Sequence, residues 1–150
     1  MADTSETTSG FLLPDVHTDD GAAFWAGAAH GELLVQACGA CGRWRFPPRP
    51  MCPWCRSLEL RWEPASGRAT IWSYAVPHPP LLPAYAERAP YNVIVVALDE
   101  DPTIRMVGNL LAHPDGTIDE VDPATIEIGA PVRVVFQPVD DVVLPQWIRA

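Results

Sequence analysis

Four cysteines, arranged as two closely spaced pairs, constrain the fold of this chain of 150 residues more than any other feature. Cys38 and Cys41 form the first pair, Cys52 and Cys55 the second, and the spacing is C-x2-C-x10-C-x2-C. In such a pair, two thiolates can converge on one cation while nearby backbone N–H groups stabilise the charge on sulfur. Two pairs complete a tetrahedral site. We therefore expect all four cysteines to bind one metal ion.

Disulfide bonds and a redox-active dithiol are the alternatives for these cysteines. Residues 1–17 contain acidic residues but neither Lys nor Arg, so they lack the basic start and apolar centre of a secretion signal. We therefore expect a cytoplasmic protein, and a reducing cytosol disfavours disulfides. A thioredoxin-like dithiol would need one pair at a helix start within a βαβ unit, whereas both pairs lie among Gly, Pro and Arg.

The spacing leaves the metal open between zinc and iron, because four thiolates suit either ion. A site saturated with sulfur has no position for water or substrate, which predicts a structural role and one Zn²⁺ per chain. Such an ion can supply about 10–16 kcal/mol of apparent folding free energy. Loss of Cys38 should therefore unfold this segment rather than abolish a chemical step.

The net charge of −9 hides a basic segment around the cysteines. Between Cys38 and Arg68, six arginines and two glutamates give +4, which leaves −13 for the rest of the chain. These arginines are either solvated surface residues or contacts for an anionic ligand. From residue 69 onward, 11 acidic residues outnumber 4 arginines, and this charge disfavours binding of single-stranded nucleic acid.

The chain before the cysteines divides into a leader and a helix. Residues 1–17 are expected to form a disordered acidic leader. Residues 18–31 predict a short helix, with N-cap side chains from Thr18 to Asp20 and a stop at Gly31. Phe24 and Trp25 are adjacent, so they point about 100° apart and one helix face cannot bury both. We expect them to contact either the following module or a partner.

After the helix, segments that alternate between apolar and polar residues or are continuously apolar predict a mainly β structure. We expect a rubredoxin-like ribbon over residues 32–66 and a barrel over residues 67–150. Short strands separated by turns indicate a five-stranded barrel, and we prefer an OB-fold. No helix is expected between the third and fourth strands. The predicted strands are 69–76, 91–98, 103–111, 132–137 and a last one that begins at residue 142. No apolar run approaches the ~20 residues of a membrane span.

A long loop joins the first two barrel strands. Residues 77–90 contain five prolines, together with Leu81, Leu82 and Tyr85. This composition is too apolar for a simple linker, and long loops in compact domains are commonly functional. We expect the loop to be ordered, either on the barrel or on a partner.

Nine short motifs follow one another along the chain: Gly31-Glu32-Leu33, Gln36-x-Cys38-x-x-Cys41-Gly42, Phe46-Pro47-Pro48-Arg49, Cys52-Pro53-x-Cys55, Ser66-Gly67-Arg68, Pro90-Tyr91, Leu98-Asp99-Glu100, Gly129-x-Pro131-Val132 and Leu144-Pro145. Together they resemble the DUF35 family, and the resemblance runs from about residue 24 to residue 148. The resemblance implies an N-terminal helix, a zinc ribbon and a C-terminal OB-fold. It also implies a small non-catalytic subunit of acyl-CoA metabolism, including steroid degradation, associated with thiolase-like enzymes (lipid-transfer-protein-like aldolases, thiolases or acyltransferases) or with MaoC-type hydratases.

The residues themselves offer no catalytic apparatus. The chain has no Lys, no G-x-S-x-G and no phosphate-binding loop, and its four histidines occupy places where solvated or capping roles are ordinary. We therefore predict no catalytic residue. A single-stranded nucleic-acid-binding OB module and a free-standing CoA-dependent enzyme remain as alternatives.

In an acyl-CoA setting, the basic segment would meet phosphates and a planar adenine, for which Arg and Trp are suitable partners. We hypothesise that the ribbon edge and the partner together line the mouth of a tunnel for a coenzyme A thioester. The candidate ligand residues are Arg43, Trp44, Arg45 and Arg49. The candidate partner contacts are Phe24, Trp25, Leu81, Leu82 and Tyr85. Contact with an acidic partner surface is the alternative for the arginines.

Overall fold

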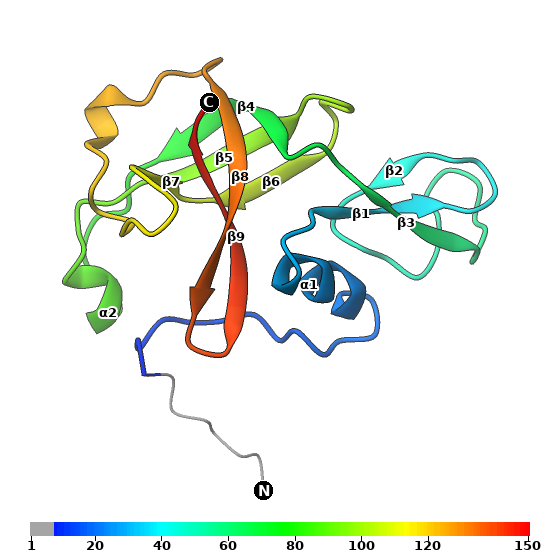
Figure 1. The fold of residues 1–150 in the computed structure, drawn as a ribbon, viewed down its shortest axis with the longest axis horizontal. Helices are drawn as coiled ribbons and strands as arrows, with labels where there is room; N and C mark the ends of the chain where they lie inside the picture. The colour runs from blue at the N-terminus through cyan, green and yellow to red at the C-terminus, as the bar shows by residue number, and fades with distance from the viewer. Residues whose placement is uncertain (1–7) are drawn as a thin grey trace, which may run out of the picture.

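The computed structural model describes residues 8–150 as a small sheet and a large curled sheet, with a helix that contacts both (Figure 1). The helix lies between the two sheets, and the small sheet extends away from the large one. The predicted mainly β fold, with an N-terminal helix and a cysteine-bearing ribbon before an OB-fold sheet, is confirmed. No helix among residues 8–150 is long and apolar enough to cross a membrane.

The small sheet is antiparallel and has the order β2-β1-β3. The large sheet has the order β6-β5-β4-β8-β9-β7. The elements run along the chain as α1 (Ala22–Ala29), β1 (Leu34–Cys38), β2 (Trp44–Arg45), β3 (Leu60–Pro64), β4 (Arg68–Ala75), α2 (Pro83–Ala86), β5 (Val93–Leu98), β6 (Arg105–Gly108), β7 (Leu110–Leu111), the 3-10 turn η1 (Pro123–Thr125), β8 (Pro131–Val139) and β9 (Val142–Arg149).

The prediction of one strand over residues 103–111 is wrong, because the strand breaks at Asn109 into β6 and β7. β6 pairs antiparallel with β5, whereas β7 pairs parallel with β9. The backbone N–H of Asn109 donates to Oε1 of Gln146 over 2.6 Å, and its carbonyl accepts from the N–H of Trp147 over 3.1 Å. Since β6 and β7 are opposite edges of one sheet, the single residue between them brings these edges together, and the large sheet has six strands instead of five.

The core is continuous across the two sheets. Phe24 of α1 and Val35 of β1 belong to the same buried cluster as Ile71, Val96 and Trp147 of the large sheet. β5 is central in its sheet, as its apolar sequence predicts, and every second residue along it is fully buried. The shared cluster fixes the ribbon against the barrel.

Helix α1 begins without the predicted side-chain cap. Gly21 occupies the N-cap position, and no side chain bonds to the first turn. Instead the carbonyl of Thr18 accepts from the N–H groups of Gly21 and Ala22, at 3.1 and 2.9 Å. A backbone turn therefore replaces the expected contribution of Thr18, Asp19 and Asp20.

Residues 8–17, expected to belong to a disordered leader, lie along the turn between β8 and β9 (Figure 1). Oγ of Ser9 donates to Asp140 over 2.6 Å, and the ring of Phe11 lies 5.0 Å from that of Tyr85. Contacts such as that of Phe11 could not be predicted from the acidic composition of this segment. Residues 1–7 of the expected leader lie outside the described residues.

The proline-rich loop lies on the barrel and contains one unpredicted helical turn, α2. Tyr85 of α2 packs between Phe11 and Tyr91, and its hydroxyl accepts from the N–H of Leu12 over 3.2 Å. Between β7 and β8, where no helix was expected, the described chain contains the short 3-10 turn η1 and no α-helix.

Candidate metal centre and ribbon surface

The four cysteine sulfurs converge, as the spacing predicts. Their Sγ atoms all lie within 4.8 Å of one another, with 3.5 Å between Cys38 and Cys55 and 3.7 Å between Cys41 and Cys52. Four sulfurs around one zinc at about 2.3 Å would lie about 3.8 Å apart, whereas a disulfide requires about 2.05 Å. The residues therefore fit a tetrahedral metal ion, and all four cysteines are free thiols.

Each cysteine pair is followed by a residue whose backbone has the left-handed conformation. Gly42 follows the first pair with φ +77° and donates its N–H to the carbonyl of Cys38 over 3.0 Å. Arg56 follows the second pair with φ +63° and donates in the same way to Cys52 over 2.9 Å. This conformation costs glycine little, but any other residue about 1–3 kcal/mol. Arg56 was not among the predicted site residues, and its place after a Cys-x-x-Cys pair is the signal that could have identified it.

Backbone amides stabilise thiolates at two of the cysteines. The N–H groups of Cys41 and Ala40 point at Sγ of Cys38 from 3.4 Å, and these bonds, that of Cys41 first, lower the pKa of Cys38 to about 6. At Cys52, the amide of Cys55 is the main cause of a lowered pKa. Both buried cysteines are thus prepared to be ligands in the ionised form.

Cys55 behaves differently because the other sulfurs surround it. The amide of Ser57 acts to lower its pKa, but the side chains of Cys38, Cys52 and Cys41, together with burial, outweigh this and raise it to about 11. Four ionised thiols at these distances are therefore compatible only with a cation among them.

The candidate ligand residue Arg45 lies inside the ribbon. It is 3% exposed, and its Nε donates to Oε1 of Gln36 over 2.5 Å. Its Nη2 donates to the carbonyl of Arg49 over 3.1 Å, while the N–H of Arg49 reaches the same Gln36 oxygen over 2.8 Å. These bonds hold the segment between the two cysteine pairs against β1. The side chain of Arg49 is exposed.

Trp44 is partly buried, and its indole N–H is bonded. Its Nε1 donates to Oε2 of Glu63 over 2.5 Å, and Nε of Arg61 approaches the other oxygen to 2.6 Å. The bond from Trp44 and then that from Arg61 lower the pKa of Glu63. Trp44 thus joins β2 to β3 and offers only part of its ring to a ligand.

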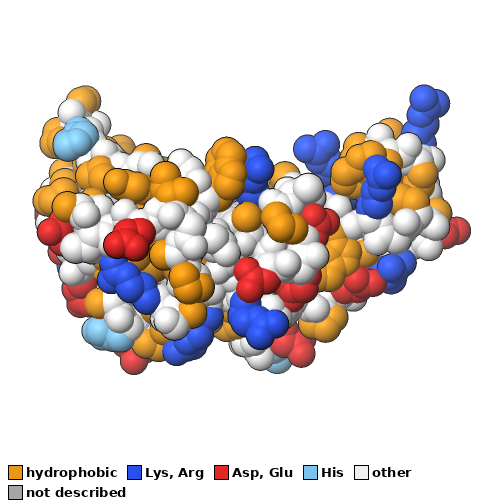
Figure 2. Space-filling view, turned by 90° about the horizontal axis from the view of Figure 1, so that it is seen from above, with side chains coloured by type: hydrophobic (Ala, Val, Ile, Leu, Met, Phe, Trp, Pro, Cys, Tyr) orange, Lys and Arg blue, Asp and Glu red, His pale blue; other side chains and the backbone are white. Residues whose placement is uncertain are grey.

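Arg43 lies on the surface over a second tryptophan. Its guanidinium carbon is 5.2 Å from the ring centre of Trp54, which is 51% exposed. Trp54 stands between Cys52 and Cys55, so this cation–π contact joins the two cysteine pairs. Figure 2 shows basic side chains interspersed with apolar ones on the ribbon side of the molecule. Sequence pattern does not identify Trp54 as a site residue, because only the fold places it beside Arg43.

The predicted partner contacts do not form one patch. Phe24 is 7% exposed and packs against Trp25 and Phe46, with ring centres 5.0 and 5.6 Å away. Trp25 is partly buried. The other candidates belong to the loop that contains α2, which lies on the opposite side of the β8–β9 hairpin from α1 in Figure 1. Among them, Leu82 is the most exposed, at 52%.

The sulfur geometry and the curled sheet define a zinc-ribbon protein with an OB-fold. Comparison with family models gives the same assignment: "ChsH2, rubredoxin-like zinc ribbon domain" matches residues 25–61 and "ChsH2, C-terminal OB-fold domain" matches residues 62–137. The chain belongs to this family, the DUF35 proteins, as its motifs predicted.

Curated relatives carry two kinds of name. The chain is 38% identical over 79% of its length to a "Probable enoyl-CoA hydratase alpha subunit" of Thermomonospora curvata, and 34% identical over 85% to the "3-oxo-4,17-pregnadiene-20-carboxyl-CoA hydratase alpha subunit" of Mycobacterium tuberculosis. It spans only 33% and 37% of these two proteins. A "DUF35 domain-containing scaffold protein" of Methanothermobacter thermautotrophicus is 36% identical over 72% of the chain and 74% of its own length.

Among solved structures, the chain resembles one from a complex named "Ltp2-ChsH2(DUF35) aldolase". The TM-score is 0.77 and the sequence identity is 33%. The match covers 91% of this chain and 98% of the solved one.

Proposed function

We propose that this chain is a non-catalytic accessory subunit that binds a thiolase-like partner, namely a lipid-transfer-protein-type aldolase, a thiolase or an acyltransferase. The observation that carries the proposal is the structural likeness to nearly the whole DUF35 chain of the Ltp2-ChsH2 aldolase complex. The partner would hold the catalytic groups, and this chain would complete its acyl-CoA tunnel. We place the complex in the cytoplasm and in lipid metabolism, with steroid degradation suggested by the name of the Mycobacterium relative.

A hydratase partner is the second candidate, because two curated relatives are named hydratase alpha subunits. In those relatives the matching region is about a third of a longer protein, 33% and 37% of its length. This chain would then be an accessory subunit of a MaoC-type enoyl-CoA hydratase. A nucleic-acid-binding role is less well supported, because residues 69–150 carry 11 acidic residues against 4 arginines.

We assign a structural role to a zinc ion in the ribbon. The four cysteines would hold it, and it would supply the positive charge that their thiolates require at this spacing. With four sulfur ligands the ion has no open position, so it would order the ribbon surface without touching substrate.

For the coenzyme A moiety, the exposed part of the ribbon is the proposed contact. Arg43 offers a guanidinium for bidentate bonding to phosphate, and Trp54 beside it offers an indole face for the adenine. The exposed side chain of Arg49 and the cationic Arg56, held in left-handed backbone, add positive charge nearby in the sequence. Arg45 is excluded from direct contact by its burial, so it would act by positioning the loop.

Steady-state kinetics of a reconstituted complex with a thiolase-like partner test this contact. Arg43→Ala should raise KM for acyl-CoA about tenfold, the amount expected for one charge-assisted hydrogen bond, with kcat and assembly unchanged. Arg133→Ala, at an exposed arginine of β8, is the matched control and should change neither constant. An unaltered KM for Arg43→Ala would reject the contact. A weaker complex would show instead that Arg43 meets the partner.

A further inference from the structure

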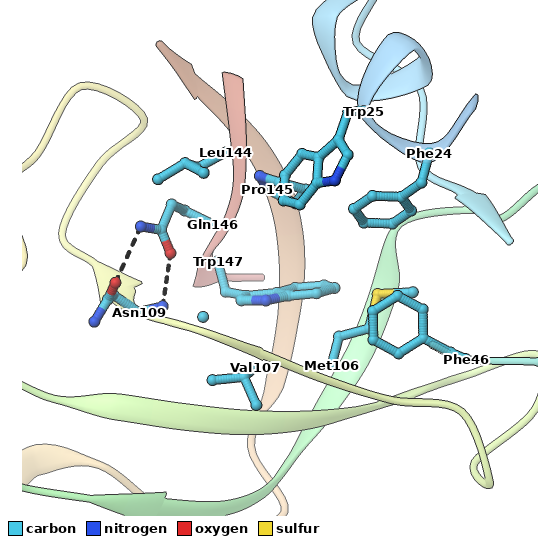
Figure 3. A pocket seen from close by; sticks show the side chains of 11 residues that line it. Phe24, Trp25, Phe46, Met106, Val107, Asn109, Leu144, Pro145, Gln146 and Trp147 are labelled. Atoms are coloured by element: carbon cyan, nitrogen blue, oxygen red, sulfur yellow. Dashed lines mark hydrogen bonds between the residues drawn. The ribbon is translucent and has the colours of Figure 1, made fainter. Parts of the chain in front are cut away.

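A small apolar pocket lies where β6 and β9 face each other without pairing, beside α1 (Figure 3). Its volume is about 220 Å³. Three parts of the chain supply its walls: α1, the segment after β2, and the strands of the barrel. The main apolar contributors are Phe24, Trp25, Phe46, Met106, Leu144 and Trp147. None of its lining residues carries an ionisable side chain.

The amide side chains of the pocket are already bonded to each other. Nε2 of Gln146 donates to Oδ1 of Asn109 over 3.0 Å, and Oε1 of Gln146 accepts the N–H of Asn109, as the dashed lines of Figure 3 show. The Nδ2 of Asn109 donates to the carbonyl of Asn92 over 2.5 Å. Each of these amide groups therefore already has a partner within the chain, and the bonds stiffen the wall.

One donor in the wall has no partner. Trp147 is fully buried, and its Nε1 makes no hydrogen bond within the described chain. A buried donor without a partner is unfavourable, so its persistence indicates an acceptor that binds from outside the chain. Gly108 lies directly beside this atom, because a Cβ built there would stand 3.0 Å from Nε1. Residue 108 therefore places no side chain against that edge of the indole.

We propose that the pocket binds a small, uncharged, apolar molecule through a carbonyl oxygen that accepts a hydrogen bond from Nε1 of Trp147. A carboxylate would be desolvated there without any cation, and both a hydrocarbon and a ligand that carries only donor groups would leave Nε1 unpaired. Trp147 is sealed from water, so entry requires a side chain to move. Trp25, which is partly buried, lines the pocket next to Trp147 (Figure 3). This inference concerns the chain alone and does not depend on a partner.

Nuclear magnetic resonance of the metal-loaded full chain tests the proposal, with cyclohexanone as probe and the indole N–H signals as readout. Cyclohexanone should move the Trp147 signal in a saturable manner and leave that of Trp72, on the barrel exterior, in place. Cyclohexane should cause a smaller change at this signal, and cyclohexanecarboxylate should not bind.

Two variants of the pocket and one control variant outside it make the test specific. Trp147→Phe keeps a ring but removes the donor, and it should weaken cyclohexanone binding about tenfold, the loss expected for one hydrogen bond. Because Phe leaves a space in the core, Gly108→Ala provides an independent test: it blocks the indole edge and should abolish the saturable shift, whereas Trp72→Phe should leave it intact. The proposal is overturned if cyclohexanone gives no saturable shift or if ketone and hydrocarbon act equally.

Discussion

Arg45 donates from Nε to Oε1 of Gln36 over 2.5 Å, and the two side chains are 3% and 1% exposed. The same Gln36 oxygen accepts the N–H of Arg49, and a second Arg45 nitrogen reaches the Arg49 carbonyl. One glutamine of β1 thus fixes the start and the middle of the segment between the two cysteine pairs. Arg45, next in sequence to the partly buried Trp44, can therefore stabilise the ribbon from within, while Arg43 faces solvent.

This division between Arg43 and Arg45 predicts different effects on stability. Arg45→Ala removes one buried and one partly buried hydrogen bond and should lower the free energy of unfolding by about 2 kcal/mol. Arg43→Ala removes one exposed contact and should change it by less than about 0.5 kcal/mol. Urea denaturation of the metal-loaded chain measures both. Equal losses in the two variants would contradict the assignment of Arg45 to the interior.

Metal removal should unfold the ribbon and leave the barrel folded. β1 to β3 carry few core residues beyond those that contact α1 and the barrel, whereas the large sheet has its own buried strands. We expect about one metal ion per chain by elemental analysis, and a colourless protein if that metal is zinc. Chelation, or Cys38→Ser, should abolish the slow amide exchange of β1 and preserve that of β5. A ribbon that keeps its protection without metal would contradict the structural role.

The junction that brings the edge strands β6 and β7 together should depend on Asn92. This residue is fully buried, and its side chain accepts from the N–H of Leu110 over 2.7 Å and donates to its carbonyl over 2.9 Å. Asn92→Ala leaves both backbone groups unpaired and should cost about 2–4 kcal/mol in thermal or urea unfolding. Gln137→Ala, which removes one bond to the carbonyl of Gly116, is the amide control. It should cost clearly less, and a reversed order would be inconsistent with the structure.

Glu63 should stabilise the ribbon at neutral pH. Bonds from Trp44 and Arg61 lower its pKa below the usual 4.5, so the folded state favours the ionised form. A depressed folded pKa stabilises the protein above the unfolded pKa, and the contribution disappears as pH falls through the folded pKa. Glu63→Gln should therefore lower Tm by the same amount at pH 8 and pH 6, with the difference from wild type shrinking only below about pH 4.5. A difference that vanished between pH 8 and pH 6 would argue against these bonds.

The metal site and the order of the fold follow from local patterns. The Cys-x-x-Cys pairs place four sulfurs together because a tight turn determines the geometry within each pair, and the strands β4, β5, β8 and β9 follow from period and turn residues. The break at Asn109 could not be predicted in this way. It depends on contacts with Asn92 and Gln146, which lie 17 and 37 residues away in sequence.

The roles of the aromatic and basic residues required the structure for the same reason. The sequence places Arg43, Trp44 and Arg45 side by side, but alternation along β2 and burial against β1 give them different environments. Trp54 and Arg56 were missed because their significance depends on a neighbour across the metal site and on backbone conformation. The contacts of residues 8–17 depend on Tyr85, which lies far along the chain, and composition cannot predict such a contact.

Affinity capture of the tagged chain from its native lysate, with quantitative mass spectrometry after a moderate salt wash, tests the accessory role most directly. The account predicts a thiolase-like subunit in near-equal molar amount, and acyl-CoA turnover only by the complex. A hydratase in that position would support the second candidate partner. Recovery of the folded, metal-loaded chain by itself, or acyl-CoA turnover by the isolated chain, would contradict the accessory role.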